Sequence, residues 1–205
     1  MPTYRSNKNR PGTANRLTKC YHGPPNTYIL SSPIGNLELV SCARGIHTLG
    51  QVEGITDDTF QPDISIQVQL ISQLYPDNGY TYKPVQACIQ WLNNYFQNPV
   101  EAKLQSPPTI CFIHTKEGSF TERVWQTLAE KTKYGNTVSY AELAEVCGSA
   151  KACRKVGTAM RNNPVQLIIP CHRVIRSNGT FGDYCAGSRN SVKTWLLQME
   201  DVIKS

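Results

Sequence analysis

The chain has 205 residues, of which 40% are hydrophobic and 18% charged, and its formal net charge at pH 7 is +6. These values are typical of a globular protein with one domain or two small ones, and the positive charge favours an anionic partner. Every apolar stretch is far shorter than the roughly 20 residues that cross a bilayer, so we expect no membrane span.

The first residues, Met1 to Arg16, are polar and basic and lack the apolar core of a secretory signal. We predict a disordered basic tail over residues 1–19. Two roles stay open for this tail: it assists nucleic-acid binding or nuclear import, or it is simply solvated. The eight cysteines of the chain, without such a signal, indicate a reducing compartment. Reduced thiols fill a core, bind a metal or do chemistry.

The N-terminal half has the pattern of a small sheet with one helix. Residues 28–30 and 37–41 alternate around a turn at 32–36, which predicts a hairpin, and 45–52 predicts a further strand. A helix is predicted from Pro84, with apolar residues at helical spacing and Pro99 beyond its end. Residues 105–108 indicate a linker, and residues 110–113 predict a short strand.

The C-terminal half has the pattern of helices. Ser119 with Glu122, and Ser139 with Glu142, are capping-box pairs that predict two helix starts. Gly148 ends the second of these helices, and we expect Ser149 to cap the next one, over residues 151–161. Two short helices across a tight turn predict a helix-turn-helix, although most helical hairpins bind no DNA.

The helix at 151–161 is predicted to have two different faces. One face is apolar and should pack inward; its residues are Ala152, Val156, Ala159 and Met160. The opposite face is small and cationic, with Arg154, Gly157, Thr158 and Arg161. Small residues between arginines let a nucleic-acid backbone approach while the cations meet phosphates. The alternative is an ordinary solvated face.

The apolar run Val165 to Ile169 is followed by the motif Pro170-Cys171-His172-Arg173, in which a proline directly precedes the cysteine. A glycine-rich segment follows at 177–187. Proline fixes its own φ and lacks an N–H, so we expect Cys171 at a rigid strand exit. The neighbouring imidazole and guanidinium make the setting electropositive, which favours the reactive thiolate. We predict that Cys171 is a nucleophile, the alternative being a small buried core residue.

With these motifs the chain resembles the O6-alkylguanine-DNA alkyltransferases, also called methylated-DNA–protein-cysteine methyltransferases. The resemblance rests on Ile169 to Val174, on Arg161-Asn162-Asn163-Pro164, on Val138-Ser139-Tyr140 and on Ser32 to Leu37. The resemblance extends over residues 28–200. It implies a mixed α/β (α+β) fold in which a ribonuclease-H-like sheet domain over 20–108 precedes a helical, winged-helix-like domain over 109–205.

The resemblance also implies a function, the direct reversal of alkylation damage in double-stranded DNA. The protein would bind the minor groove, rotate the damaged nucleotide outward and transfer the O6-alkyl group of guanine to Cys171, once per molecule. His172 would act through water as the base and would be oriented by Glu200. Asn163 would tie the recognition helix to the strand bearing Cys171, and Tyr184 would donate to the leaving guanine.

For DNA contact the resemblance implies that Tyr140 presses on a phosphate and that Arg154 fills the gap left by the extruded base. The helix with the cationic face would lie in the minor groove, where small residues permit close approach. The full set of predicted DNA-binding residues is Tyr140, Arg154, Thr121, Ser149, Lys151, Ala152, Cys153, Gly157, Thr158, Arg161 and Ser177. The predicted pocket residues are Met160, Val174, Tyr184 and Cys185. Taken singly, Tyr140 and Tyr184 could instead be half-buried aromatics, and Glu200 an exposed helix residue.

Three features depart from the family pattern. Lys155 follows Arg154 where a small residue is frequent, which adds positive charge beside the groove. Cys185 stands where several members carry serine, so a second thiol lies near the predicted nucleophile and could form a disulfide with Cys171 if the geometry permits. The loop at 188–191 is two residues longer than in the family.

Some eukaryotic members of the family hold a structural zinc ion, and this chain has residues at or near the corresponding positions. These are Cys20, Cys42, His47 and Cys111, and a Cys₃His set suits tetrahedral zinc. His22 and His114 are alternative ligands, and a chance coincidence of core residues is the other explanation. We predict a structural zinc, no organic cofactor, a monomer whose partner is double-stranded DNA, and a nuclear location.

Two other classes of function compete with alkyl transfer. A non-catalytic DNA-damage binder of the same fold would replace the nucleophile, whereas this chain keeps Cys171. A Cys/His hydrolase needs Cys171 and His172 in contact, but adjacent residues of an extended strand point to opposite faces. The sequence therefore favours the alkyltransferase.

Overall fold

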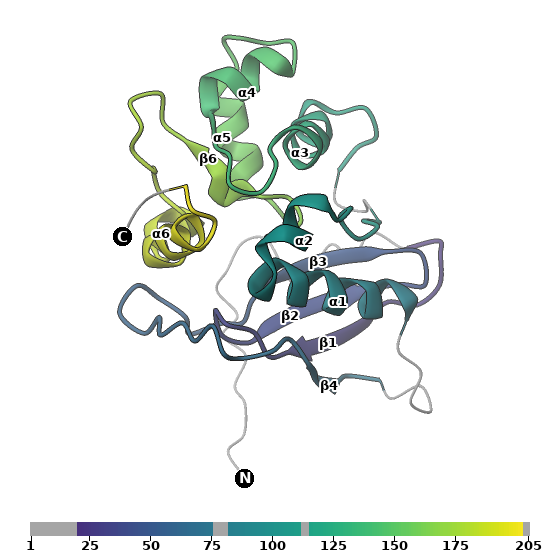
Figure 1. Ribbon diagram of the computed structural model, residues 1–205. Coiled ribbons are helices and arrows are strands. Elements are labelled where there is room, and N and C mark those ends of the chain that lie inside the picture. The colour runs from purple at the N-terminus through teal and green to yellow at the C-terminus, as the bar shows by residue number, and fades with distance from the viewer. Residues whose placement is uncertain (1–19, 76–81, 112–114, 203–205) are drawn as a thin grey trace.

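The computed structural model describes residues 20–75, 82–111 and 115–202. Figure 1 shows a sheet with a helix across it in the N-terminal part and a group of helices in the C-terminal part. This arrangement confirms the predicted mixed α/β fold class. Within the described ranges, no helix is both long enough and apolar enough to cross a membrane. The predicted tail over 1–19 lies outside the described residues.

The N-terminal sheet has four strands in the order β3-β2-β1-β4, and every neighbouring pair is antiparallel. The strands are β1 (Asn26–Leu30), β2 (Leu37–Ser41), β3 (Ile46–Gln51) and β4 (Leu70–Gln73). The predicted hairpin is confirmed, with Leu30 opposite Leu37 and Gly35 in the turn at φ 94°, which glycine adopts without strain. The sequence did not predict β4, because its mostly exposed side chains do not alternate in burial.

The predicted helix is α1 (Lys83–Gln97), and it crosses the sheet in Figure 1. Its buried face follows the helical spacing of the sequence and consists of Val85, Cys88, Leu92, Tyr95 and Phe96. Pro99 lies beyond the end of α1 as predicted, and there it begins the short helix α2 (Pro99–Leu104). Proline suits that position because the first helical N–H has no partner within a helix.

The strand predicted at 110–113 is wrong in its described part, because Ile110 forms only one isolated bridge, with Ile46. Backbone bonds hold this segment against the start of β3: the Ile46 N–H donates to Thr109 O at 2.9 Å and the Cys111 N–H to Ile46 O at 2.8 Å. Gly45 permits this approach, since a Cβ there would lie 2.7 Å from Thr109 O. The C-terminal part of the chain therefore begins bonded to the edge of the sheet.

The C-terminal part contains the helices α3 (Phe120–Lys131), α4 (Tyr140–Val146), α5 (Cys153–Arg161) and α6 (Asn190–Met199). Two short strands, β5 (Val138–Ser139) and β6 (Val174–Ile175), pair in parallel. The capping box at Ser139 and Glu142 is complete. At α3 only half of the predicted box forms, because Glu122 accepts from the Gly118 N–H instead of from Ser119.

The start of α5 differs from the prediction. Ala152, not Ser149, occupies the N-cap, and no side chain caps this helix. Gly148 ends the preceding helix as predicted, at φ 77°, and the Ala152 N–H then donates to Ser149 O at 2.8 Å. A capping Ser149 side chain would accept from the Ala152 N–H, but that N–H is already bonded to the Ser149 carbonyl in the turn. The helix α5 therefore begins at Cys153, two residues later than expected.

The two faces of α5 are confirmed. Val156, Ala159 and Met160 are buried, whereas Arg154, Thr158 and Arg161 are exposed. Trp125 of α3 fixes the inner side, because its Nε1 donates to Ala159 O at 2.8 Å.

The segment that carries the reactive-cysteine motif is not a strand exit. Residues 165–169 fold back on themselves, with the Ile169 N–H donating to Val165 O at 3.0 Å and Leu167 at φ 67°. Cys171–Arg173 then forms the 3₁₀-helix η1. Bonds within this loop satisfy the backbone locally, and only one bridge, between Leu49 and Val165, joins the loop to β3. The strand-based argument about where Cys171 and His172 point therefore loses its premise.

Candidate active site and metal-ligand cluster

A cavity of about 610 Å³ lies between α5, the end of β6 and the segment 182–185. Many of the predicted site residues line it: Tyr140, Cys153, Arg154, Gly157, Met160, Arg161, Asn163, Cys171, Tyr184 and Cys185. Val174, predicted as a pocket residue, is not among the residues that line it; it is fully buried, and its carbonyl accepts from Lys193. The pairing of β5 with β6 brings the segments leading to Tyr140 and from Cys171 side by side.

The thiol of Cys171 is buried at this cavity, with 7% of the residue exposed. Asn163 holds it: Nδ2 donates to Cys171 Sγ at 3.1 Å and to Ile169 O at 2.8 Å, while Oδ1 accepts from the Val165 N–H at 2.9 Å. The Tyr184 side chain also hydrogen-bonds to the thiol. Asn163 thus joins the end of α5 to the segment of Cys171, which agrees with the predicted tie.

Burial raises the pKa of Cys171, while the hydrogen bonds from Asn163 and Tyr184 and the charge of Lys193 act in the opposite direction. The prediction that His172 and Arg173 make the thiol electropositive is therefore wrong. Both side chains bond to Glu200 instead. Because desolvation outweighs the local charges, the resting form of Cys171 is the protonated thiol.

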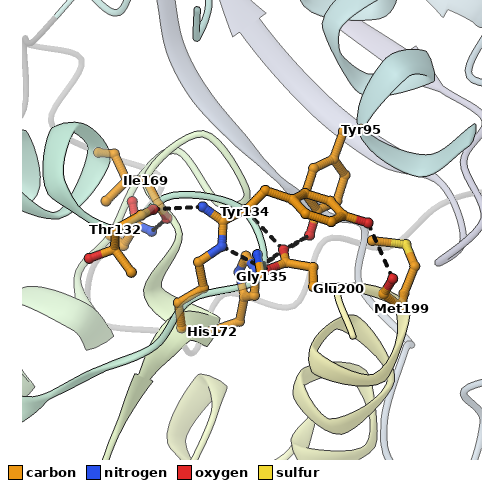
Figure 2. A network of polar contacts seen from close by, with 10 residues as sticks. Tyr95, Thr132, Tyr134, Gly135, Ile169, His172, Met199 and Glu200 are labelled. Atoms are coloured by element: carbon orange, nitrogen blue, oxygen red, sulfur yellow. Dashed lines mark hydrogen bonds and ion pairs between the residues drawn. The ribbon is translucent and has the colours of Figure 1, made fainter. Parts of the chain in front are cut away.

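Glu200, the residue after α6, is the centre of a buried polar network (Figure 2). Its Oε1 lies 2.9 Å from His172 Nε2 and accepts from Arg173 at 3.0 Å and from the Tyr95 hydroxyl at 2.5 Å. Its Oε2 accepts from Arg173 Nε at 2.8 Å and from the Gly135 N–H at 3.3 Å. The carboxylate therefore joins three segments of the chain that are distant in sequence.

In this network the pKa directions favour an ionised Glu200 and a neutral His172. Burial alone would raise the pKa of Glu200, but contacts with His172 and Arg173 outweigh it and hold that pKa far below the usual value. Burial lowers the pKa of His172, which favours the neutral imidazole. Because a carboxylate only accepts, Nε2 carries the proton of the neutral ring. Nδ1 is buried without a partner among the described residues and is left as an acceptor.

Two residues of the site were missed by sequence reasoning. Tyr95 comes from α1 in the N-terminal half, and its apolar helical spacing gave no sign of a polar role. Lys193 is 1% exposed on α6 and donates to Val174 O at 2.7 Å and to Phe181 O. Burial lowers its pKa to about 8. A lysine among Val192, Leu196 and Leu197 on the inner face was the signal that could have found it.

The remaining predicted DNA-binding residues lie on α5, in the turn before it, in the first turn of α3 and after β6. Thr121 and Ser149 are half-buried, and Lys151 and Ser177 are exposed. Two backbone N–H groups just before α5 are already engaged: the Ser149 N–H donates to Ala144 O at 2.9 Å, and the Ala152 N–H donates to Ser149 O, with the Ala152 side chain buried. Those two amides are therefore not available for a phosphate.

The predicted zinc ligands lie together at the other end of the sheet. The candidate ligand atoms of Cys20, Cys42, His47 and Cys111 are all within 4.8 Å of one another. Zinc bonds of about 2.0–2.3 Å place tetrahedral ligand atoms roughly 3.3–3.8 Å apart, so these atoms would have to move together by no more than about 1 to 1.5 Å to hold the ion. His22 contacts Arg44 at 2.8 Å and is not in the cluster, and His114 lies outside the described residues. The residues present fit a closed Cys₃His site.

The thiols of this cluster interact with one another. The pKa of Cys42 is lowered: burial acts to raise it, but backbone hydrogen bonds from Arg44 and Gly45 and the neighbouring thiols outweigh that effect. Burial and the Cys42 thiol raise the pKa of Cys111 to about 12. Zinc would favour the ionised form of its thiol ligands.

Comparison with known proteins gives one family. The ribonuclease-like domain of 6-O-methylguanine DNA methyltransferase matches residues 27–105, and the DNA-binding domain of the same family matches residues 119–202. The methylated-DNA–protein-cysteine methyltransferase of Mus musculus is 37% identical over 174 residues, covering 85% of this chain and 80% of the relative. The Homo sapiens protein of that name is 36% identical over 171 residues, covering 83% and 78%.

Solved structures agree with these sequence matches. The Mycobacterium tuberculosis O6-methylguanine methyltransferase superposes with a TM-score of 0.59 at 28% identity, covering 85% of this chain and 92% of that one. A complex of the Mycobacterium tuberculosis protein with DNA superposes with a TM-score of 0.58 at 29% identity, covering 84% and 90%.

Proposed function

The chain belongs to the 6-O-methylguanine DNA methyltransferase family and is a methylated-DNA–protein-cysteine methyltransferase, and we propose from its site that Cys171 is the acceptor. It repairs DNA by alkyl transfer. In the proposed reaction a damaged guanine is rotated out of the duplex into the 610 Å³ cavity. The alkyl group then passes from O6 to the sulfur.

The observation that carries this proposal is the Cys171 thiol at the cavity, held by the Asn163 amide at 3.1 Å and by the Tyr184 hydroxyl. In the reaction a sulfur–carbon bond forms and the carbon–O6 bond breaks. The thiol proton passes through a water molecule to His172 Nδ1, the buried nitrogen that is left as an acceptor because Nε2 bonds to Glu200. Tyr184 donates to the guanine as negative charge develops on it.

The raised pKa of Cys171 makes this proton transfer necessary. A resting thiol is a poor nucleophile, so the enzyme ionises it only with the substrate in place. The product is a thioether, which is not cleaved under mild conditions. Each molecule therefore acts once, and the alkylated cysteine is the end of the reaction.

The DNA would be read by α4 and α5, acting as a helix-turn-helix whose second helix enters the minor groove. The exposed Arg154 and Arg161 lie on either side of Gly157 along α5. Gly157 has no side chain, and apart from its neighbours and the backbone of its own helix no atom of the described chain lies within 4 Å of the place where its Cβ would be. A narrow groove can approach such a face closely. Arg154 would fill the place of the extruded nucleotide, and Tyr140, half-buried at the cavity rim, would press on the phosphate.

The remaining assignments complete this proposal. The domain boundary falls between 20–108 and 109–205, the protein acts as a monomer on double-stranded DNA, and it works in the nucleus. Zinc held by the cluster of Cys20, Cys42, His47 and Cys111 would join the start of the described chain, the β2–β3 hairpin and the segment leading to the second domain. It would supply folding stability and no chemistry.

Incubation with the free base O6-benzylguanine tests the function. We expect one benzyl group per molecule, located on Cys171 by peptide mass spectrometry, and none on the Cys171→Ser protein. The Cys185→Ser protein is the control for the position of the adduct, because it removes another thiol from the same cavity and should still carry its one benzyl group on Cys171. Continued release of guanine would indicate a hydrolase, and no adduct would indicate a binding protein; either result contradicts the proposal.

A further inference from the structure

We propose that Arg189 is a positioning residue that attaches the wall of the alkyl-acceptor cavity to the N-terminal sheet. This proposal rests on the proposed role of Cys171 as acceptor. The wall is the segment 184–189, which runs from Tyr184 through the 3₁₀-helix η2 (Cys185–Gly187) to the start of α6. Nothing in the reaction itself involves Arg189, which does not line the cavity.

Arg189 crosses from the C-terminal part of the chain to the end of β3 and the loop after it. Its Nε donates to Ile55 O at 3.0 Å, its NH2 group to Val52 O at 3.3 Å, and its NH1 group lies 3.4 Å from Gln51 Oε1. Gln51 is itself fixed, since its Nε2 donates to Ile34 O at 2.7 Å. One guanidinium therefore bonds to three acceptors in a part of the chain more than 130 residues away.

A second contact lies beside the first and involves the same loop. Asp57 Oδ1 accepts from the Ser191 N–H at 2.7 Å and from its hydroxyl at 2.6 Å, and the Asp57 N–H donates to Ser188 O at 3.1 Å. The residues on both sides of Arg189 are thus bonded to the N-terminal half. This places the beginning of α6, whereas Glu200 fixes its end.

Short hydrogen bonds carry this attachment to the reacting group. Asn190, next to Arg189, accepts from the Tyr184 N–H at 2.9 Å and donates to Gly187 O at 3.2 Å. The Gly187 N–H donates to Tyr184 O at 2.9 Å. Tyr184 in turn bonds to the Cys171 thiol. A shift of Arg189 therefore moves the backbone that carries the Tyr184 hydroxyl.

The opposite wall of the cavity is attached to the same strand. The Leu49 N–H of β3 donates to Pro164 O at 2.9 Å, and the Gln166 N–H donates to Leu49 O at 2.8 Å, next to Asn163. Gln166 Nε2 reaches across to Cys185 Sγ at 3.8 Å. Because β3 and its following loop bond to both walls, the sheet sets the separation of Asn163 and Tyr184, the two donors to Cys171.

The test is the single-turnover benzylation of Arg189→Ala by O6-benzylguanine, a substrate that needs no DNA. A misplacement of about 1 Å at a reacting centre can cost up to about 100-fold in rate. We expect the limiting first-order rate constant to fall about tenfold, with a smaller change in the half-saturating concentration. Arg189→Lys, which can still donate to one carbonyl, should recover part of the rate.

The control is Arg123→Ala, which removes the contact of an exposed arginine with a backbone carbonyl, Cys147 O at 3.3 Å, away from the cavity. Its limiting rate should equal that of the wild type. Asp57→Ala removes the second contact and should slow benzylation in the same direction as Arg189→Ala. Urea unfolding of each protein gives the folded fraction under the assay conditions, and the rates are compared per folded molecule.

Two outcomes overturn the inference: a normal limiting rate in Arg189→Ala, or rates that fall only in proportion to the folded fraction. Failure of the proposed function is a different result, because the wild-type protein would then acquire no benzyl group on Cys171.

Discussion

Replacing Glu200 with glutamine tests the buried network directly. The substitution keeps the shape of the side chain but removes the charge that neutralises Arg173. Both side chains are buried, with 8% of Arg173 and none of Glu200 exposed, so water screens little of the lost interaction. Breaking one partner of a buried pair costs about 3–5 kcal/mol, because the other charge is left uncompensated. We expect a loss of that size in the free energy of unfolding.

The measurement is urea unfolding followed by tryptophan fluorescence and circular dichroism. With a denaturant slope of about 2 kcal/mol per molar, the midpoint should fall by about 2 M. Arg173→Met and the double variant complete a mutant cycle. The double variant should cost less than the sum of the two single costs, by about 1–3 kcal/mol, because it leaves neither charge unpaired.

The same network predicts a dependence of stability on pH. The pKa of Glu200 is lower in the folded protein than in the unfolded chain, where it is about 4.3. Its contribution is therefore complete above that value and decreases as the pH falls below it. The Glu200→Gln protein should lack this acid-dependent loss. A cost below about 1 kcal/mol, or additive costs in the cycle, would refute the argument that Arg173 depends on this carboxylate.

Three further results are expected. Because the pKa of Cys171 is raised and that of His172 is lowered, both groups keep their resting forms between pH 7 and pH 9, and the proton passes between them inside the protein. The benzylation rate measured by mass spectrometry should therefore change little over this range, and a rate that rises about tenfold per pH unit would show that Cys171 instead loses its proton to solvent. Arg154→Ala should slow repair of a methylated duplex by at least tenfold while free O6-benzylguanine still reacts normally; equal slowing of both would remove Arg154 from DNA recognition. The purified protein should contain about one zinc per chain, with less zinc and lower thermal stability in Cys111→Ser, and under about a tenth of an equivalent in the wild type would end the zinc assignment.

Much of the fold and many of the site residues follow from local sequence patterns. The hairpin of β1 and β2, the cap at Ser139 and the two faces of α5 depend on residues within one strand or one helical turn. Such patterns act through short-range geometry, alternate residues in strands and every third or fourth residue in helices, and short-range geometry can be recognised without knowing the rest of the chain. The edge strand β4, with exposed and unpatterned side chains, has no such signal.

The state of the reacting group depends on distant contacts instead. From the sequence, His172 and Arg173 are neighbours of Cys171 and should favour its thiolate, but the fold brings Glu200 to both of them and buries the thiol. Tyr95 joins that network from more than 100 residues away. Desolvation and charge pairing are set by which groups surround an atom in space, not by which residues adjoin it in the chain.

The sequence by itself therefore determined the family pattern, the nucleophile candidate, the cationic helix and the metal-ligand set, because these need only residue types at characteristic spacings. Only the tertiary structure decided that Cys171 rests protonated in a 3₁₀-turn, that Glu200 pairs with Arg173 and Tyr95 as well as with His172, and that Arg189 bonds the cavity wall to the sheet. The reason is that burial and hydrogen bonding across the molecule outweigh the influence of adjacent residues on each group.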